Sequence, residues 1–223
     1  MLVAAAVCPH PPLLAPELAG VAAGELDGLR SACAVATAGL RAARPDTVVV
    51  VGGAEEAGSY GPDAAGSLAP WGVDVRIGPG EPVLPLSLTL GRRLVEEAGL
   101  AASAFHAVPF DAPQAECAAL GARLAEGAGR VAMLVMADGS ARLTEKSPGH
   151  LDPRARPYDD ALAAALARGE IPDLDPGEAA GLWVAGRAAL QVLAGAAGPL
   201  DGELLHHDAP YGVGYLVALL RAV

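Results

Sequence analysis

Strongly apolar runs alternate with amphipathic stretches along this chain. The runs that predict buried strands lie at residues 2–7, 47–51 and 130–136. Apolar positions recur at near-helical spacing, and so predict helices, over residues 24–43, 86–98, 113–126, 154–168 and 176–193. Shorter strands are expected at residues 73–77 and 103–108, and a closing hairpin at residues 203–207 and 214–220.

Strands separated by helices predict an α/β fold with a mixed, mainly parallel central sheet and helices on both faces. Residues 52–85 are rich in Gly, Pro and Ala and interrupt this alternation. A connection this long is more often functional than passive. The 223 residues contain no repeat and no interdomain linker, so we expect one domain spanning residues 1–223.

Composition narrows the functional classes. No apolar stretch reaches the roughly 18–20 residues of a membrane span, and the N-terminus lacks the basic region of a signal peptide. The net charge of -11 argues against nucleic acid as a partner. Three cysteines without CxxC spacing predict neither a disulfide framework nor a zinc ribbon, which suits a reducing cytoplasm. A single lysine and abundant Ala, Gly and Pro suggest a GC-rich bacterial genome.

His10 is the leading candidate site residue. The first strand ends at Cys8-Pro9-His10-Pro11-Pro12, where the prolines forbid further strand pairing. The imidazole is thus delivered to the carboxyl end of a buried strand, where open α/β sheets bind ligands. It could line a pocket and hold a metal, or simply be a hydrogen-bonded histidine at a strand exit. Cys8 lies two residues away and could share a metal with it or form a thiolate–imidazolium pair.

Polar residues also follow the other two apolar strands. Glu55 and Glu56 leave the strand at 47–51 and could supply carboxylate ligands, or belong to a solvated acidic loop. Asp138 and Ser140 follow the strand at 130–136. Asp138 could orient the histidine of the first strand, or close an Asx turn. Arg142 could bind an anionic substrate group, or form a surface ion pair.

The remaining polar candidates lie late in the chain. His150, in a loop, could act as a catalytic base or remain at the surface. His206 and His207 are adjacent in an expected strand, so they face opposite sides and one of them could reach a pocket. Tyr211 could place its hydroxyl near an aromatic ligand, or serve packing. No glycine-rich phosphate-binding motif is present.

Three segments together resemble a known family. They are Pro9-His10-Pro11-Pro12; the strand ending at Met136 with the following Ala137-Asp138-Gly139-Ser140-Ala141-Arg142; and Ala209-Pro210-Tyr211-Gly212-Val213-Gly214-Tyr215. In this order they resemble the class III extradiol ring-cleavage dioxygenase superfamily, which includes the Memo-like proteins. The resemblance covers nearly the whole chain and implies that superfamily's fold. It also implies an oxidoreductase with non-haem Fe(II), held in part by His10, that acts on a small aromatic or phenolic compound.

The chain departs from that family at three positions. No histidine follows the strand at 47–51, Ala141 stands where the catalytic base is expected, and the third metal ligand has no clear counterpart, although Glu178 lies nearby in the sequence. One hypothesis is an extradiol dioxygenase-like enzyme, its activity retained or lost, with Fe(II), zinc or no metal and with His150 or His207 replacing the base.

The alternative hypothesis is a catalytically inert binding or structural protein that keeps the pocket without a metal. A metal-dependent hydrolase using the same pocket is a third, weaker reading, and a homo-oligomer is compatible with all three. In each case the exits of the three apolar strands should converge on one cleft, because parallel strands share a carboxyl edge. The family resemblance implies that the turn at residues 209–215 forms one wall of it.

Overall fold

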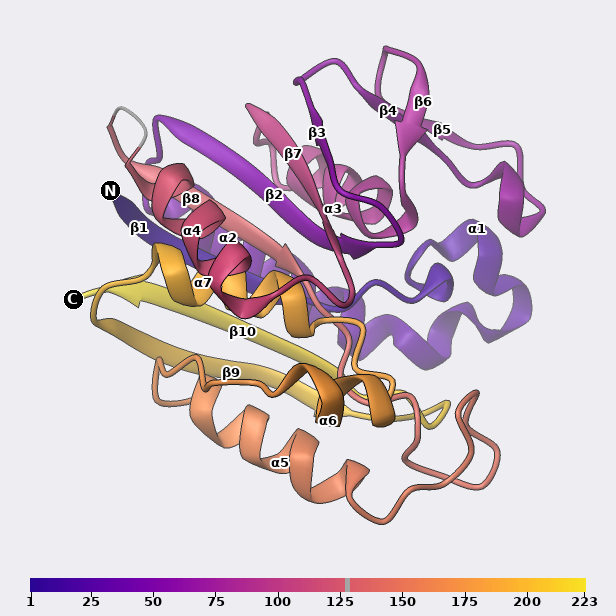
Figure 1. Cartoon of the computed structure of the whole chain (residues 1–223). Coiled ribbons are helices and arrows are strands. Elements are labelled where there is room, and N and C mark those ends of the chain that lie inside the picture. The colour runs from indigo at the N-terminus through magenta and orange to yellow at the C-terminus, as the bar shows by residue number, and fades with distance from the viewer. Residues whose placement is uncertain (127–128) are drawn as a thin grey trace.

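The computed structural model describes residues 1–126 and 129–223 and confirms the expected α/β fold. The described residues form a seven-stranded central sheet (Figure 1). From one edge to the other its strands are β3 (Gly58–Tyr60), β7 (Ala104–Pro109), β2 (Thr47–Ala54), β8 (Val131–Met136), β1 (Leu2–Cys8), β10 (Tyr215–Ala222) and β9 (Leu200–Asp208). The four neighbours β7, β2, β8 and β1 are parallel, whereas β3, β10 and β9 pair antiparallel.

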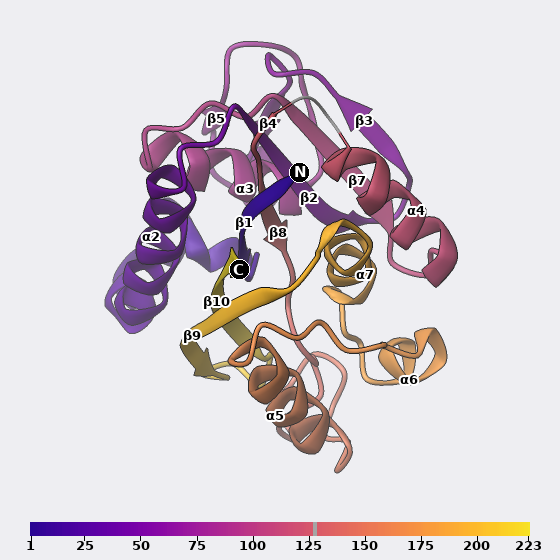
Figure 2. The same cartoon turned by 90° about the vertical axis from the view of Figure 1, so that its left-hand side faces the viewer.

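Helices cover both faces of the sheet, as Figure 2 shows. The α-helices are α1 (Pro16–Ala19), α2 (Asp27–Ala42), α3 (Leu86–Glu97), α4 (Gln114–Ala125), α5 (Ala155–Leu166), α6 (Pro176–Gly181) and α7 (Arg187–Ala196). The α2 and α3 helices pack on one face, and α4, α7 and α5 pack on the other. A mainly parallel sheet with both faces covered explains the wholly apolar strands of the sequence.

Strand alternation divides the core between the two faces. In β2, Val48 and Val50 pack toward α2 and α3, whereas Val49 and Val51 pack toward α4 and α7. All four valines are nearly inaccessible to solvent. Their β-branched side chains favour this extended, buried position. The same alternation determines the side from which each strand delivers the residues after its end.

The long connection between β2 and α3 is more ordered than expected. It contains β3 and a small second sheet of three short strands, β5 (Arg76–Ile77), β4 (Ala65–Ser67) and β6 (Pro82–Leu84). The strand expected at residues 73–77 is thus shortened to β5. The described residues also form the 3₁₀ segments η1 (Pro12–Leu14), η2 (Gly20–Leu26) and η3 (Ala69–Trp71). The start of the helix expected at residues 24–43 belongs to η2.

The single helix expected over residues 176–193 is wrong, because the structure divides it into α6 and α7. Asp175 caps α6 by accepting a 2.7 Å hydrogen bond from the N–H of Glu178. The helix then ends in a Schellman motif, in which the Val184 N–H bonds the carbonyl of Ala179 and Trp183 takes a left-handed φ of 55°. That position usually holds glycine, so a tryptophan there concealed the helix end. Residues 182–186 form the connection to α7, here called the α6–α7 connection.

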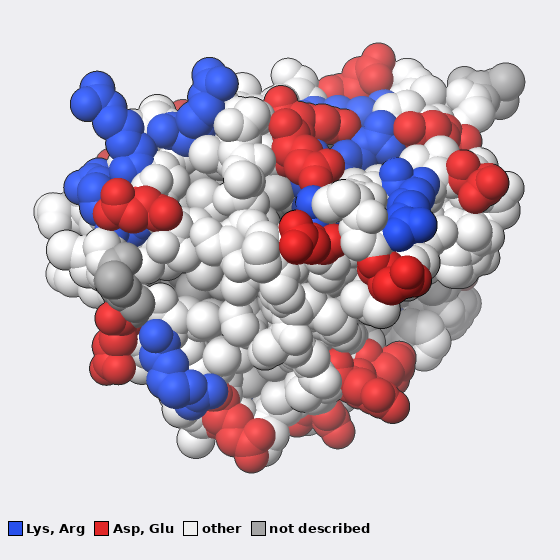
Figure 3. Space-filling view, turned by 90° about the horizontal axis from the view of Figure 1, so that it is seen from above, with Lys and Arg blue, Asp and Glu red and all other residues white. Residues whose placement is uncertain are grey.

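Positive and negative side chains are mixed on one face of the molecule. On the face shown in Figure 3, Lys and Arg are interspersed with Asp and Glu and do not form a continuous basic surface. Across the described residues, no helix combines the length and the apolar composition needed to cross a membrane.

Candidate functional site

The exits of β1 and β8 meet at the carboxyl edge of the sheet, where His10 and Asp138 lie together. The backbone N–H of His10 donates a 2.7 Å hydrogen bond to Asp138 Oδ1. The same oxygen is 3.6 Å from His10 Nδ1, beyond hydrogen-bonding distance. His10 is 7% exposed, and its Nδ1 has no hydrogen-bond partner among the described residues. Asp138 therefore holds the main chain of the β1 exit and leaves the imidazole Nδ1 without a hydrogen bond from the described residues.

The residues around His10 do not fit the iron site that the family resemblance implies. Such a site takes two histidines and a carboxylate, but the described residues contain no group of three His, Cys, Asp or Glu side chains placed to hold a metal ion. Cys8 turns to Cys33, and their hydrogen bond, together with burial, raises the pKa of the Cys8 thiol well above its usual value. Glu55 is exposed. It comes directly after β2, on the side of the sheet that α4 and α7 cover.

Residues 138–142, which follow β8, form a turn that fastens the end of α6 to the sheet. Ser140 Oγ donates a 2.6 Å hydrogen bond to the carbonyl oxygen of Leu182. Arg142 Nη1 donates a 2.7 Å hydrogen bond to the carbonyl oxygen of Gly181. Ser140 is fully buried, and the Arg142 guanidinium is occupied by main-chain oxygens. Both side chains therefore hold a loop in place, and Arg142 Nη1 also lies 3.8 Å from Asp152 Oδ2, the ion pair expected as the alternative.

Asp159, on α5, is a buried carboxyl beneath this turn. Its residue is 0% exposed, and its Oδ1 accepts a 2.9 Å hydrogen bond from the Ser140 N–H. Oδ2 has no hydrogen-bond partner among the described residues. A Cβ atom added at Gly139 or Gly214 would collide with this carboxyl group. The carboxyl group therefore fits here because both positions are glycine. Burial raises the pKa of Asp159 to about 6.

A cavity of about 460 Å³ opens beside the 138–142 turn, at the exits of β2 and β7. We call it the edge cavity. Its lining comprises Glu55, Phe110, Asp111, Ala141, Trp183 and Ala185, together with small apolar residues of α6 and the α6–α7 connection. Neither His10 nor Asp138 lines it. Its volume falls within the range of small-molecule sites, which are mostly apolar and carry a few convergent polar groups.

Two exposed aromatic side chains form walls of the edge cavity. Phe110 is 38% exposed and Trp183 is 55% exposed. The Phe110 ring lies over Gly53 of β2, where an added Cβ would come within 2.6 Å of the ring atom Cε1. The connection that carries Trp183 is held at its far end by the Gly186 N–H, which donates a 2.9 Å hydrogen bond to the Asp138 carbonyl. Both aromatic residues therefore belong to segments that are attached to the central sheet.

The charged side chains in the lining of the cavity are acidic. Glu55 follows β2 and Asp111 follows β7, and these strands are parallel neighbours. They are the charged residues in the lining. Neither forms an ion pair with any residue in the described part of the chain. The cavity therefore combines aromatic surface with uncompensated negative charge.

The other sequence candidates lie outside the edge cavity. The Tyr211 hydroxyl donates a 2.8 Å hydrogen bond to Glu25 at the surface. His150 is exposed, and its Nδ1 lies 2.9 Å from the Glu145 carbonyl oxygen. His207 on β9 approaches α5, and burial lowers its pKa. Glu56 is exposed and absent from the cavity lining.

The residues that sequence reasoning missed carried partial signals. Phe110 and Asp111 follow the strand expected at residues 103–108, so the rule that singled out Glu55 at a parallel strand's end applied to them too. Asp159 lies on the face of α5 that carries buried Leu162, and a charged residue on an apolar helix face was a visible anomaly. Trp183 was hidden inside a helix that appeared continuous.

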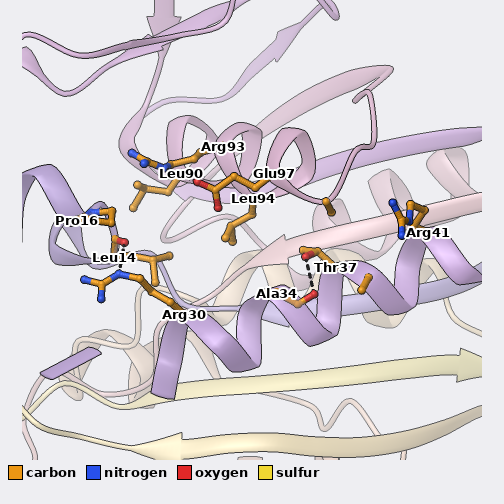
Figure 4. Close-up of a pocket in the computed structure, with 12 residues that line it drawn as sticks. Leu14, Pro16, Arg30, Ala34, Thr37, Arg41, Leu90, Arg93, Leu94 and Glu97 are labelled. Carbon is orange, nitrogen blue, oxygen red and sulfur yellow. Dashed lines mark hydrogen bonds and ion pairs between the residues drawn. The ribbon is translucent and has the colours of Figure 1, made fainter. Parts of the chain in front are cut away.

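A second hollow of about 260 Å³ lies between α2 and α3, and Figure 4 shows its arginines around an apolar floor. Arg93 is held by both oxygens of Glu17 and by Glu97. Arg30 donates to three carbonyl oxygens and to Asp27. These two guanidiniums are therefore already satisfied within the chain, which weakens the case for an anion site there.

A third hollow, of about 370 Å³, contains a serine–histidine contact. Ser59 Oγ lies 3.0 Å from His106 Nδ1. These residues are directly opposed on β3 and β7, so cross-strand pairing explains the contact without a ligand. Burial lowers the pKa of His106, which favours its neutral form.

Comparison with known proteins adds the fold but no function. No protein-family model matches the chain, and no curated protein matches it. The crystal structure of uncharacterized protein JW3007 from Escherichia coli K12 is similar, with a TM-score of 0.57 and 14% sequence identity. The match covers 99% of this chain and 100% of that chain. At this identity the likeness concerns the arrangement of the whole chain and not its chemistry.

Proposed function

We propose that this protein binds a small molecule with an apolar, flat body in the edge cavity, without a metal ion held by protein ligands. The observation that carries the proposal is the position of the cavity, at the carboxyl edge of the parallel strands β2 and β7 and walled by two exposed aromatic rings. In open α/β sheets that edge is where ligands bind. Exposed aromatic residues that gather at one concave site also indicate ligand binding more strongly than exposed aromatic residues scattered over the surface.

The fixed walls favour a binding role. The 138–142 turn is bonded to the carbonyl oxygens of Gly181 and Leu182, and Gly186 is bonded to Asp138. A wall fixed before the ligand arrives lowers the ordering cost of binding. Ala141 belongs to this turn and contributes a methyl group to the lining, in place of the histidine that the family resemblance implies. The cavity therefore offers shape and charge but no base at that position.

Ring cleavage of a small phenolic compound is the second candidate, and His10 supports it. Its buried Nδ1 has no partner among the described residues and lies beside Asp138, so one imidazole and one carboxylate meet at the edge of the sheet. We rank this activity second because the described residues supply no third donor to that group. It predicts that iron binding depends on His10, whereas the binding proposal predicts that it does not.

Fluorescence of Trp183 tests the binding proposal directly. The chain contains two tryptophans, so Trp71→Phe leaves Trp183 as the sole indole reporter. Titration with benzyl alcohol, a small neutral aromatic probe, should change its emission saturably. Ala141→Leu, which fills the cavity, should weaken that response, whereas Ala38→Leu in the hollow between α2 and α3 should leave it unchanged. A response that is linear, or insensitive to Ala141→Leu, would overturn the proposal.

A further inference from the structure

We infer that the ligand of the edge cavity is an organic cation, an ammonium or amidinium group carried on a flat apolar body. This inference rests on the proposed function and specifies the ligand class. The juxtaposition behind it is two carboxylates, Glu55 and Asp111, in a cavity whose walls include the rings of Phe110 and Trp183. Nothing in the family resemblance predicts this preference.

The carboxylates come from separate elements that the topology brings together. Glu55 follows β2 directly, and Asp111 lies two residues after the end of β7. The strands pair in register up to Ala54 and Pro109, so both acidic residues emerge at the same level of the sheet. Because neither carboxylate has an ion-pair partner among the described residues, a bound cation would supply the missing counter-charge. The chain's net charge of -11 adds to the attraction.

The aromatic walls suit the same ligand. A cation over the face of tryptophan or phenylalanine is attracted by the ring's quadrupole, and tryptophan is the strongest partner. Trp183 is held at a left-handed backbone position that bulky residues rarely adopt, yet it remains 55% exposed. A residue with only a packing role would be expected to bury more of its ring. An apolar body on the ligand would contact the alanines of the lining.

One buried cation is bonded to the main chain on either side of Asp111. Arg187, at the start of α7, is 1% exposed, and its Nη2 donates to the carbonyl oxygens of Phe110 and Ala112. It is not part of the lining. Arg142, the nearest basic residue on the 138–142 turn, is also directed to main-chain oxygens. Both cations therefore lie outside the cavity, and the two carboxylates face it without a positive neighbour in the lining.

Three soluble probes of similar size test the inference. Benzyltrimethylammonium, benzyl alcohol and phenylacetate each consist of a phenyl ring with one substituent, which is positively charged, neutral and negatively charged, respectively. They are titrated into the Trp71→Phe protein at low ionic strength, with Trp183 emission as the readout. We expect the cation to bind on the order of 10-fold more tightly than benzyl alcohol. Phenylacetate should bind most weakly, and added salt should reduce the advantage of the cation.

Matched charge variants then locate the preference. The double variant Glu55→Gln with Asp111→Asn should bring the cation's affinity down to that of benzyl alcohol, whose own affinity should persist. Glu56→Gln removes the same charge from the adjacent residue outside the lining and should change little. Equal loss in Glu56→Gln would indicate a general field effect and overturn the inference.

The failures of the two proposals are distinguishable. If benzyl alcohol binds and the cation binds no better, the ligand-class inference is wrong and the binding function stands. If benzyl alcohol does not change Trp183 emission saturably, the proposed function itself is wrong, whatever the charged probes do.

Discussion

Asp159 and Ser140 are joined by one hydrogen bond that fixes the turn after β8 to α5. The Ser140 N–H donates to Asp159 Oδ1 at 2.9 Å, while Oδ2 remains buried without a partner among the described residues. A carboxylate in that position is poorly solvated, so its neutral form is favoured in the folded state. The pKa of Asp159 is accordingly raised from 3.8 to about 6.

Stability should therefore depend on pH through Asp159. The pKa of Asp159 is higher in the folded than in the unfolded chain. Its favourable contribution to the free energy of unfolding is therefore complete below about pH 3.8 and is lost as pH rises through about 6. Asp159→Asn keeps an acceptor for Ser140 and removes the charge. We expect the variant to gain up to about 3 kcal/mol relative to wild type between acidic and neutral pH. Urea unfolding from pH 4 to 8 measures this, and parallel pH profiles for the two proteins would contradict it.

Ser140→Ala should loosen the wall that carries Trp183. The substitution removes the Oγ donor and leaves the Leu182 carbonyl oxygen without it, which should cost about 1–3 kcal/mol of folding free energy. In the Trp71→Phe background, Trp183 emission anisotropy should fall. Ser59→Ala is the matched control: it removes a hydroxyl contact with His106 at the far edge of the sheet and should leave the anisotropy of Trp183 unchanged. Equal effects of both substitutions would show that the hydrogen bond to Leu182 is not what holds this wall.

Metal content should be low. Protein purified without added metal should contain less than one tightly bound iron per chain, because His10 and Asp138 lack a third donor among the described residues. Elemental analysis measures this, and His10→Ala should not change the value. Stoichiometric iron or zinc that disappears in His10→Ala would contradict the prediction and favour ring cleavage.

Catechol and protocatechuate cleavage should be very slow even after anaerobic iron loading. Ala141 replaces the base that the family resemblance implies, and loss of a general base typically costs on the order of 100- to 10,000-fold in rate. His150 and His207 are bonded or packed elsewhere, so neither replaces it in this structure. The rate is measured from the yellow ring-opened product on admitting air. Rapid colour formation would show that another residue supplies the base.

The fold was predictable because the central strands of a sheet buried on both faces are apolar throughout, and such runs are recognisable in the sequence. The apolar runs around Val50 and Leu134 could only be central strands, and the intervening amphipathic stretches had to cover them. The meeting of His10 with Asp138 also followed from the shared edge of parallel strands. None of this required knowledge of side-chain contacts.

The edge cavity was harder to predict because its walls depend on two local exceptions. Trp183 ends α6 at a position where glycine is the usual signal, so the periodic pattern concealed the break. Arg142 was a candidate for binding an anionic group, but its bond to the Gly181 carbonyl oxygen depends on where that break falls. Periodicity describes which face of a helix is buried, and it carries no information on a helix end that lacks its ordinary marker.

The attachment of the α6–α7 connection has an evolutionary consequence. Ser140 and Arg142 bind the carbonyl oxygens of Leu182 and Gly181, and every amino acid has a carbonyl oxygen. The side chain of Trp183, which is 55% exposed, can therefore be exchanged without removing the bonds that hold the segment. Related chains could keep the scaffold and the anchoring turn while replacing Trp183, and so acquire a different ligand by changing a few residues of one short loop.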